Sequence, residues 1–148
     1  MKKSVKYLLI AVIAGVLIAG SVVLYMFNMP HRDVQGEDAK YIVEAENFVN
    51  EFMTNLNESN AKYLNNVVIV SGTVSEISED QLKQKVVLLK TDKAGVNCTF
   101  TTEINKNAEG LSVGDKVKIK GIVRMGASYD EDLDMAEYAI LEKSDIVK

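Results

Sequence analysis

The sequence predicts a small, mainly β domain, a closed barrel, preceded by an α-helix and by an N-terminal transmembrane helix. Two observations support this prediction. Residues 7–27 form a run of twenty-one residues without a charge, and a helix needs about 20 apolar residues to cross a bilayer. From residue 66 onward, apolar and polar residues alternate with the period of two that is typical of half-buried strands.

The N-terminal apolar segment, within residues 1–27, is interpreted as a retained anchor. A secretory signal peptide has a shorter apolar core, about 7–15 residues, followed by small residues at the cleavage point. Ala19 and Gly20 would suit such a point, but the apolar run continues to Phe27. A cleaved signal and a buried soluble helix remain the alternatives. The segment also resembles a bacterial lipobox; because Ser21 replaces the lipidated cysteine, we expect no lipid anchor.

Charges on the two sides of this segment predict its orientation. Three lysines (Lys2, Lys3 and Lys6) precede it, whereas acidic residues dilute the basic ones that follow. Because positive charge stays in the cytoplasm, we expect a cytoplasmic N-terminus and a periplasmic or extracellular domain. Residues 28–38 are expected to form a polar linker, with His31 as a polar residue beside the membrane.

Composition argues against some functions of the domain. Without residues 1–27 its net charge is −7, whereas nucleic-acid-binding proteins usually present a basic face. The chain has one cysteine, Cys98, so no intrachain disulfide is expected. Cys98 alternates with Val96 and Phe100 on one strand face, which indicates a core residue rather than a nucleophile. No catalytic constellation is evident, so we predict neither an enzyme nor a cofactor.

An amphipathic helix is predicted over residues 39–60. Apolar residues recur there at steps of three and four, which is typical of one helix face, at Ile42, Ala45, Phe48 or Val49, Phe52 and Leu56. The broad apolar face favours packing against the domain over a free stalk.

The barrel itself is expected over residues 61–148. Strands are predicted at 66–78, 85–91, 96–102, 117–124 and 136–142, the last resuming at 146–147. Gly72, inside the first strand, predicts a bulge or bend. A short helix is expected within 103–110 and a polar loop over 125–134. Five strands with a short helix between the third and the fourth form the plan of an OB-fold barrel.

Several of these segments resemble the tRNA_anti-like family of OB-fold proteins. The resemblance rests on residues 61–64 (AKYL), 68–74 (VIVSGTV), 96–100 (VNCTF) and 111–121 (LSVGDKVKIKG), together with residues 31–33 and the helix before the barrel. It extends from about residue 30 to the C-terminus. It implies the OB-fold and an envelope location, and it implies no catalytic residues.

Two acidic loops supply the candidate site. In OB-folds the loops after the first and fourth strands border the usual binding face, so the candidate ligand-binding residues are Glu79, Asp80, Tyr129, Asp130 and Tyr138. Hard cations prefer several carboxylate oxygens, which makes Asp130, Asp132 and Asp134 candidate metal ligands. That spacing lacks the central glycine and the final glutamate of an EF-hand, so a solvated acidic loop is the preferred interpretation and no metal is predicted.

The predicted function is a membrane-anchored, envelope-facing OB-fold binding module, with a protein partner, glycan or small molecule as its ligand. The alternative is a single-stranded nucleic-acid-binding protein. It would need a basic groove and stacking rings. Candidates for these are a stripe of Lys116, Lys118, Lys120 and Arg124 with Phe100, Tyr129 and Tyr138. Nucleic acid is the less favoured ligand because alternating lysines often only keep a strand soluble.

Overall fold

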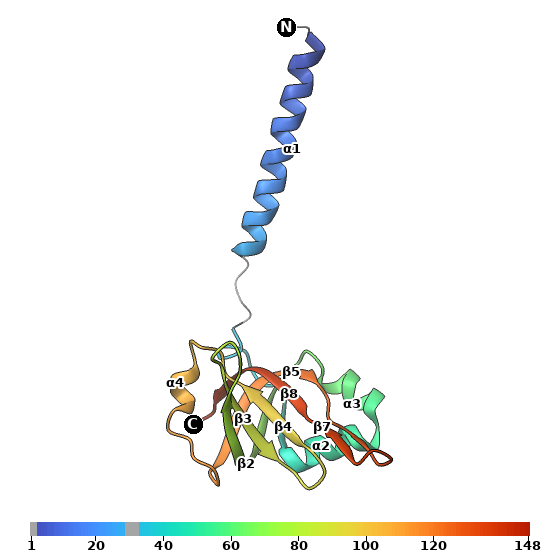
Figure 1. Cartoon of the computed structure of the whole chain (residues 1–148), viewed down its shortest axis with the longest axis vertical. Coiled ribbons are helices and arrows are strands. Elements are labelled where there is room, and N and C mark those ends of the chain that lie inside the picture. The colour runs from blue at the N-terminus through green and yellow to red at the C-terminus, as the bar shows by residue number, and fades with distance from the viewer. Residues whose placement is uncertain (1–2, 29–32) are drawn as a thin grey trace. The chain divides into compact units, whose positions relative to one another are not determined.

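The computed structural model describes residues 3–28 and 33–148, and the chain divides into two compact units, Met1–Asp33 and Val34–Lys148 (Figure 1). His31, expected to lie beside the membrane, is outside the described residues. The first unit contains helix α1 (Lys3–Phe27), none of whose side chains is buried. Its length and apolar composition suffice to cross a membrane. A signal sequence near the N-terminus can meet the same criteria. The predicted N-terminal apolar helix is therefore confirmed.

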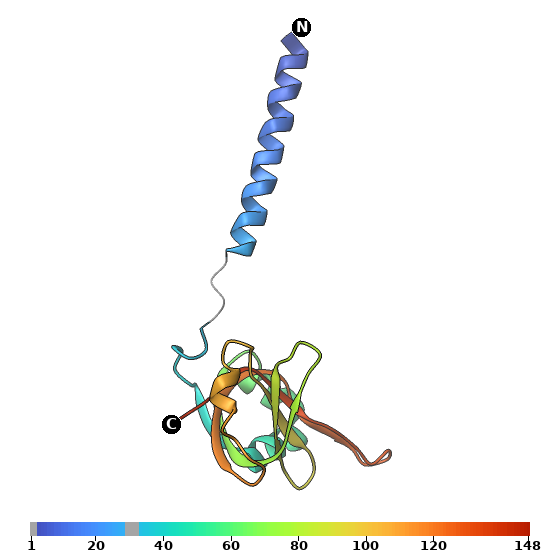
Figure 2. The same ribbon diagram turned by 60° about the vertical axis from the view of Figure 1, so that its left-hand side comes forward.

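Five strands of the second unit close into a barrel: β2 (Val67–Glu79), β3 (Lys85–Lys90), β4 (Gly95–Thr99), β5 (Lys116–Met125) and β8 (Ala139–Ile146). All neighbouring pairs are antiparallel except β4 with β8, which is parallel. The long β2 closes the barrel, because residues 67–73 pair with β5 and residues 74–79 pair with β3. The predicted five-stranded OB-fold barrel is confirmed (Figures 1 and 2).

Gly72 lies near the point where β2 changes partners. The register shift in the β2–β3 pair falls slightly later, between Val74 and Glu76. A Cβ atom at Gly72 would lie 3.1 Å from the Cβ of Ala45. The absent side chain therefore lets the start of the covering helix approach the barrel, while the predicted irregularity occurs two to four residues downstream.

The prediction of a single helix over residues 39–60 is wrong. The structure instead has strand β1 (Tyr41–Glu44), helix α2 (Ala45–Thr54) and helix α3 (Leu56–Tyr63). Strand β1 pairs in parallel with β2, which leaves Ile42 71% exposed instead of on a buried helix face. Asn55 separates the helices: its backbone is extended, and its side chain accepts a hydrogen bond from the Glu58 N–H. A new N-cap thus begins α3 where one helix was expected to continue.

Smaller differences concern the loops. The expected short helix is α4 (Asn105–Ala108). The predicted loop over 125–134 contains β6 (Ser128–Asp130), which pairs with β7 (Met135–Glu137) in a separate hairpin. The fifth barrel strand therefore starts at Ala139, later than predicted, and the third ends at Thr99. Val34, expected in the linker, is buried against Val67 and Ile122.

The core combines the inner barrel face with an aromatic cluster beneath α2. Ala45, Phe48, Val49 and Phe52 are buried, which confirms that a helix packs on the barrel. The rings of Phe48, Phe52 and Tyr63 lie with centroids 5.0–5.7 Å apart. Phe48 meets the other two rings edge to face, an arrangement that stabilises beyond the burial of apolar area.

Cys98 is fully buried beside Val96 and Phe100, as predicted. Burial raises the pKa of the Cys98 thiol, so the sulfur stays protonated and unreactive. The aromatic cluster ends in a polar group: the Tyr63 hydroxyl and the Lys62 ammonium both donate to Glu51 Oε2, at 2.8 and 2.7 Å. Hydrogen bonding by Lys62 lowers the pKa of Glu51, and burial raises the pKa of Tyr63.

Candidate functional site

The first acidic loop, between β2 and β3, is held by its own hydrogen bonds. Asp80 Oδ1 accepts hydrogen bonds from the backbone N–H groups of Leu82 and Gln84, at 2.8 and 2.9 Å. The Asn105 side chain of α4 bonds the loop through Lys83 and Lys85. Glu79 is exposed at the end of β2. Asp80 thus shapes a turn that neighbours α4.

The second acidic loop is the tip of the β6–β7 hairpin. Asp130 Oδ1 accepts hydrogen bonds from the Asp132 and Leu133 N–H groups, and Asp134 accepts one from the Tyr129 hydroxyl. This hydrogen bond raises the pKa of Tyr129. Across residues 3–28 and 33–148, no group of three or more His, Cys, Asp or Glu side chains is arranged to hold a metal ion.

The two acidic loops neighbour different elements. The hairpin lies beside the β3–β4 turn, where Tyr129, Glu131 and Asp134 share a cavity with Asp92 and Lys93. The β2–β3 loop contacts α4, and Figure 1 shows α4 and β7 on opposite sides of the barrel. The structure therefore does not bring Glu79 and Asp80 together with Tyr129 and Asp130.

The outer face of β3, β4 and β8 offers few stacking rings. Val87, Val96, Cys98 and Leu141 are buried in the core, so alternation places Val86, Leu88, Asn97 and Ile140 on the outside. Phe100 is fully buried, and Tyr138 is half-buried against the core. Of the three rings considered for nucleic-acid stacking, only Tyr129 lies on the hairpin, away from this face.

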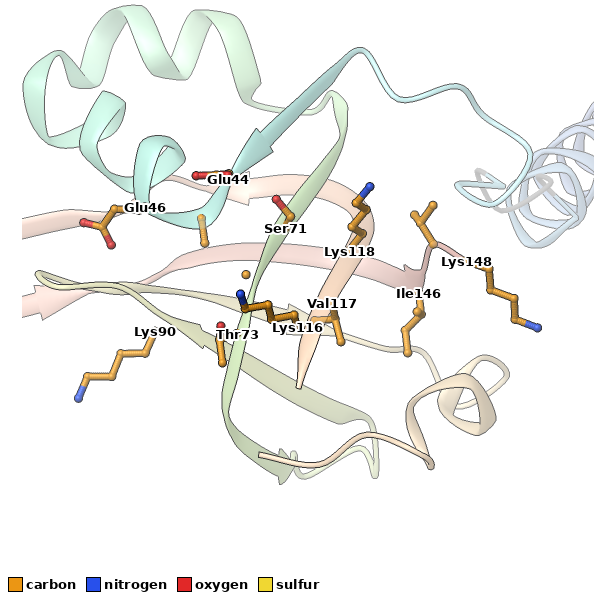
Figure 3. Close-up of a pocket in the computed structure, with 13 residues that line it drawn as sticks. Glu44, Glu46, Ser71, Thr73, Lys90, Lys116, Val117, Lys118, Ile146 and Lys148 are labelled. Carbon is orange, nitrogen blue, oxygen red and sulfur yellow. The ribbon is translucent and has the colours of Figure 1, made fainter. Parts of the chain in front are cut away.

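A groove of about 810 Å³ runs across the barrel where α2 begins (Figure 3). Its floor is formed by the middle of β2 and by apolar residues Val117, Ile146 and Val147. Four lysines line it: Lys90 at the end of β3, Lys116 and Lys118 on β5, and Lys148 after β8. We call this feature the lysine groove.

The lysine groove holds uncompensated positive charge. Within residues 3–28 and 33–148, none of its four ammonium groups has a carboxylate within 4.0 Å. Glu44 and Glu46 also line the groove, but Glu46 accepts a hydrogen bond from the Asp92 N–H at 3.2 Å. Four lysines against two glutamates leave an excess of positive charge, which attracts anions.

The predicted basic stripe divides into two parts. Lys116 and Lys118 line the groove, whereas Lys120 donates to the Gln35 carbonyl and Arg124 pairs with Glu142 at 2.8 Å. Sequence reasoning missed Lys90 and Lys148. They are distant along the chain, and only barrel closure brings them beside β5.

The closed barrel and the helix that covers it define an OB-fold protein. The chain belongs to the tRNA_anti-like family, whose model matches residues 1–131. Its fold is similar to a crystal structure from Klebsiella pneumoniae subsp. pneumoniae MGH 78578, a proposed nucleic acid-binding lipoprotein. The TM-score is 0.56 at 21% identity, and the match covers 81% of this chain and all of that one. No curated protein matches the chain.

Proposed function

We propose that this protein is a membrane-tethered OB-fold module that binds an anionic ligand in the lysine groove. The observation that supports it best is the set of four lysines without ion-pair partners around a groove of about 810 Å³. The ligand is an acidic protein segment, an anionic glycan or a small anionic molecule. Protonated lysines bind such ligands through charge and hydrogen bonds, with no covalent step, so the proposal needs no catalytic residue.

The local backbone adds to the attraction. Helix α2 begins at Ala45 on the wall of the groove, and the N-terminal end of a helix carries a partial positive charge. Glu44 and Glu46 oppose it from the same wall. Two unit charges 4 Å apart interact by about 1 kcal/mol in water and about 4 kcal/mol near a protein surface. We therefore expect affinity to depend on several contacts and to weaken with salt.

Single-stranded nucleic acid is the second candidate ligand. It is favoured by the lysines and by the binding proposed for the Klebsiella protein of similar fold. Nucleic acids, however, gain affinity by stacking bases on aromatic rings, and the groove-lining residues include no aromatic side chain. A polyanion without bases should therefore bind at least as well as an oligonucleotide of equal charge.

Replacing two groove lysines tests the site. Lys116→Gln with Lys118→Gln is expected to weaken binding of inorganic polyphosphate at least tenfold, because each hydrogen bond to a charged group contributes about 1.5–3 kcal/mol. The measurement is fluorescence anisotropy on the whole chain in non-ionic detergent at low salt. The matched control, Lys83→Gln with Lys106→Gln, removes the same charge from exposed positions outside the groove. Equal affinity of both double variants for polyphosphate would contradict the proposal.

The tether and its orientation are part of the proposed function. Lys3 and Lys6 lie in the first turns of α1, so by the positive-inside rule we expect residues 34–148 to lie outside the cytoplasm. Protease added to intact spheroplasts is expected to degrade the barrel domain while cytoplasmic proteins survive. A domain that becomes sensitive only after lysis would overturn this placement.

A further inference from the structure

The β6–β7 hairpin, residues 128–137, is the most acidic projection of the barrel domain. It carries Asp130, Glu131, Asp132, Asp134 and Glu137 and no basic residue. Its two strands pair only with each other. Leu133 and Met135 are 66% and 60% exposed at its end. We call it the acidic hairpin; it presents apolar side chains flanked by carboxylates.

Some of its carboxylates are committed within the hairpin and others are not. Asp130, Asp134 and Glu137 accept hydrogen bonds from hairpin atoms. Across the described residues, the exposed carboxylates of Glu131 and Asp132 have no ion pair or side-chain hydrogen bond. Two negative charges are therefore available to a partner, while the neighbouring carboxylates hold the hairpin together through their hydrogen bonds.

The acidic hairpin and the lysine groove are complementary. The groove places lysines around apolar Val117, Ile146 and Val147, and the hairpin places acids around apolar Leu133 and Met135. None of the groove-lining residues belongs to the hairpin, and the hairpin projects away from the C-terminal end that contributes Lys148 to the groove (Figures 1 and 2). A second copy can therefore bring its hairpin to this groove.

We propose that the acidic hairpin of one copy docks in the lysine groove of a second copy. This inference rests on the proposed function and names its anionic ligand as an acidic segment of the same chain. The contact is heterologous, so each copy keeps one unused groove or hairpin, and copies can add head to tail. Copies held in one membrane meet at a raised effective concentration, which favours a contact of modest affinity.

Zero-length carbodiimide cross-linking tests the contact, because it joins a lysine to a carboxylate only when they touch. The whole chain in non-ionic detergent at low salt is expected to give a ladder of dimers and larger species. A groove variant, Lys116→Glu with Lys118→Glu, and a hairpin variant, Glu131→Lys with Asp132→Lys, should each lose the ladder. Mixed, the two variants should regain cross-linked species, because one intact groove meets one intact hairpin and the two reversed surfaces are again opposite in charge. That recovery also shows that both variants are folded.

Matched charge changes elsewhere serve as controls. Lys83→Glu with Lys106→Glu, and Glu103→Lys with Glu109→Lys, alter net charge equally at exposed positions and should keep the ladder. No cross-linked dimer from the unmodified chain, or none from the mixture, would overturn the inference. If the copies do not cross-link but polyphosphate binding is lost only in the groove variant, the proposed function is supported and the contact between copies is not. If the groove variant binds polyphosphate as well as the unmodified chain, the proposed function fails.

Discussion

Phe52→Ala is expected to lower the free energy of unfolding of the barrel domain by about 3–5 kcal/mol. The Phe52 side chain is 1% exposed, and its ring lies 5.1 Å from Phe48 and 5.7 Å from Tyr63, between centroids. Truncation removes this burial and leaves a cavity between α2 and the barrel. Since small domains are stable by about 5–15 kcal/mol, much of the stability would be lost. Urea unfolding of the whole chain in detergent, followed by tyrosine fluorescence, measures the change.

Leu56→Ala is the matched control for this truncation. Leu56 was expected on the same buried helix face, but it begins α3 and is 46% exposed. Its replacement should change stability by about 0.5 kcal/mol or less, as at other surface positions. Equal losses at Phe52 and Leu56 would contradict the described division between α2 and α3.

Gly126→Ala is expected to destabilise the domain by about 1–3 kcal/mol or more through overpacking. A Cβ atom at Gly126 would lie 2.3 Å from two ring atoms of Phe52, well inside van der Waals contact. The ring is wedged between its aromatic neighbours, so it cannot move aside freely. Gly110→Ala is the control, because a Cβ atom there meets nothing within 4 Å; urea unfolding compares the two.

Combining the two changes isolates the collision. In the double variant Phe52→Ala with Gly126→Ala, the ring that the new methyl group would strike is absent. The loss of stability should therefore be smaller than the sum of the two single losses, since contacting residues are not additive. An additive result would show that Gly126→Ala acts through something other than Phe52.

Much of the barrel could be predicted from local patterns, because inward and outward residues alternate along each strand. Val96, Cys98 and Phe100 illustrate this: all three are buried as expected. Strand β1 could not be predicted in this way. Its four residues fit either a helix face or a strand, and the choice depends on a free edge of β2 that the sequence does not display.

The site was less predictable than the fold, because its residues come together only in three dimensions. Lys116 and Lys118 are adjacent on one strand face and could be recognised as a pair. Lys90 and Lys148 join them through the closure of the barrel. The acidic loops were expected to share one binding face, an assumption taken from the general OB-fold plan. Here Asp80 lies near α4, and Asp130 lies in a separate hairpin.

The burial of Cys98 makes the protein convenient for site-specific labelling. It is the only cysteine in the chain, and it is fully enclosed with a raised pKa. A cysteine introduced on the surface, for example at Glu131, is therefore the only thiol that maleimides reach while the barrel is closed. Cys98 itself reacts only when the barrel opens. The rate at which a thiol reagent modifies Cys98 therefore measures that opening in the chain without any introduced residue.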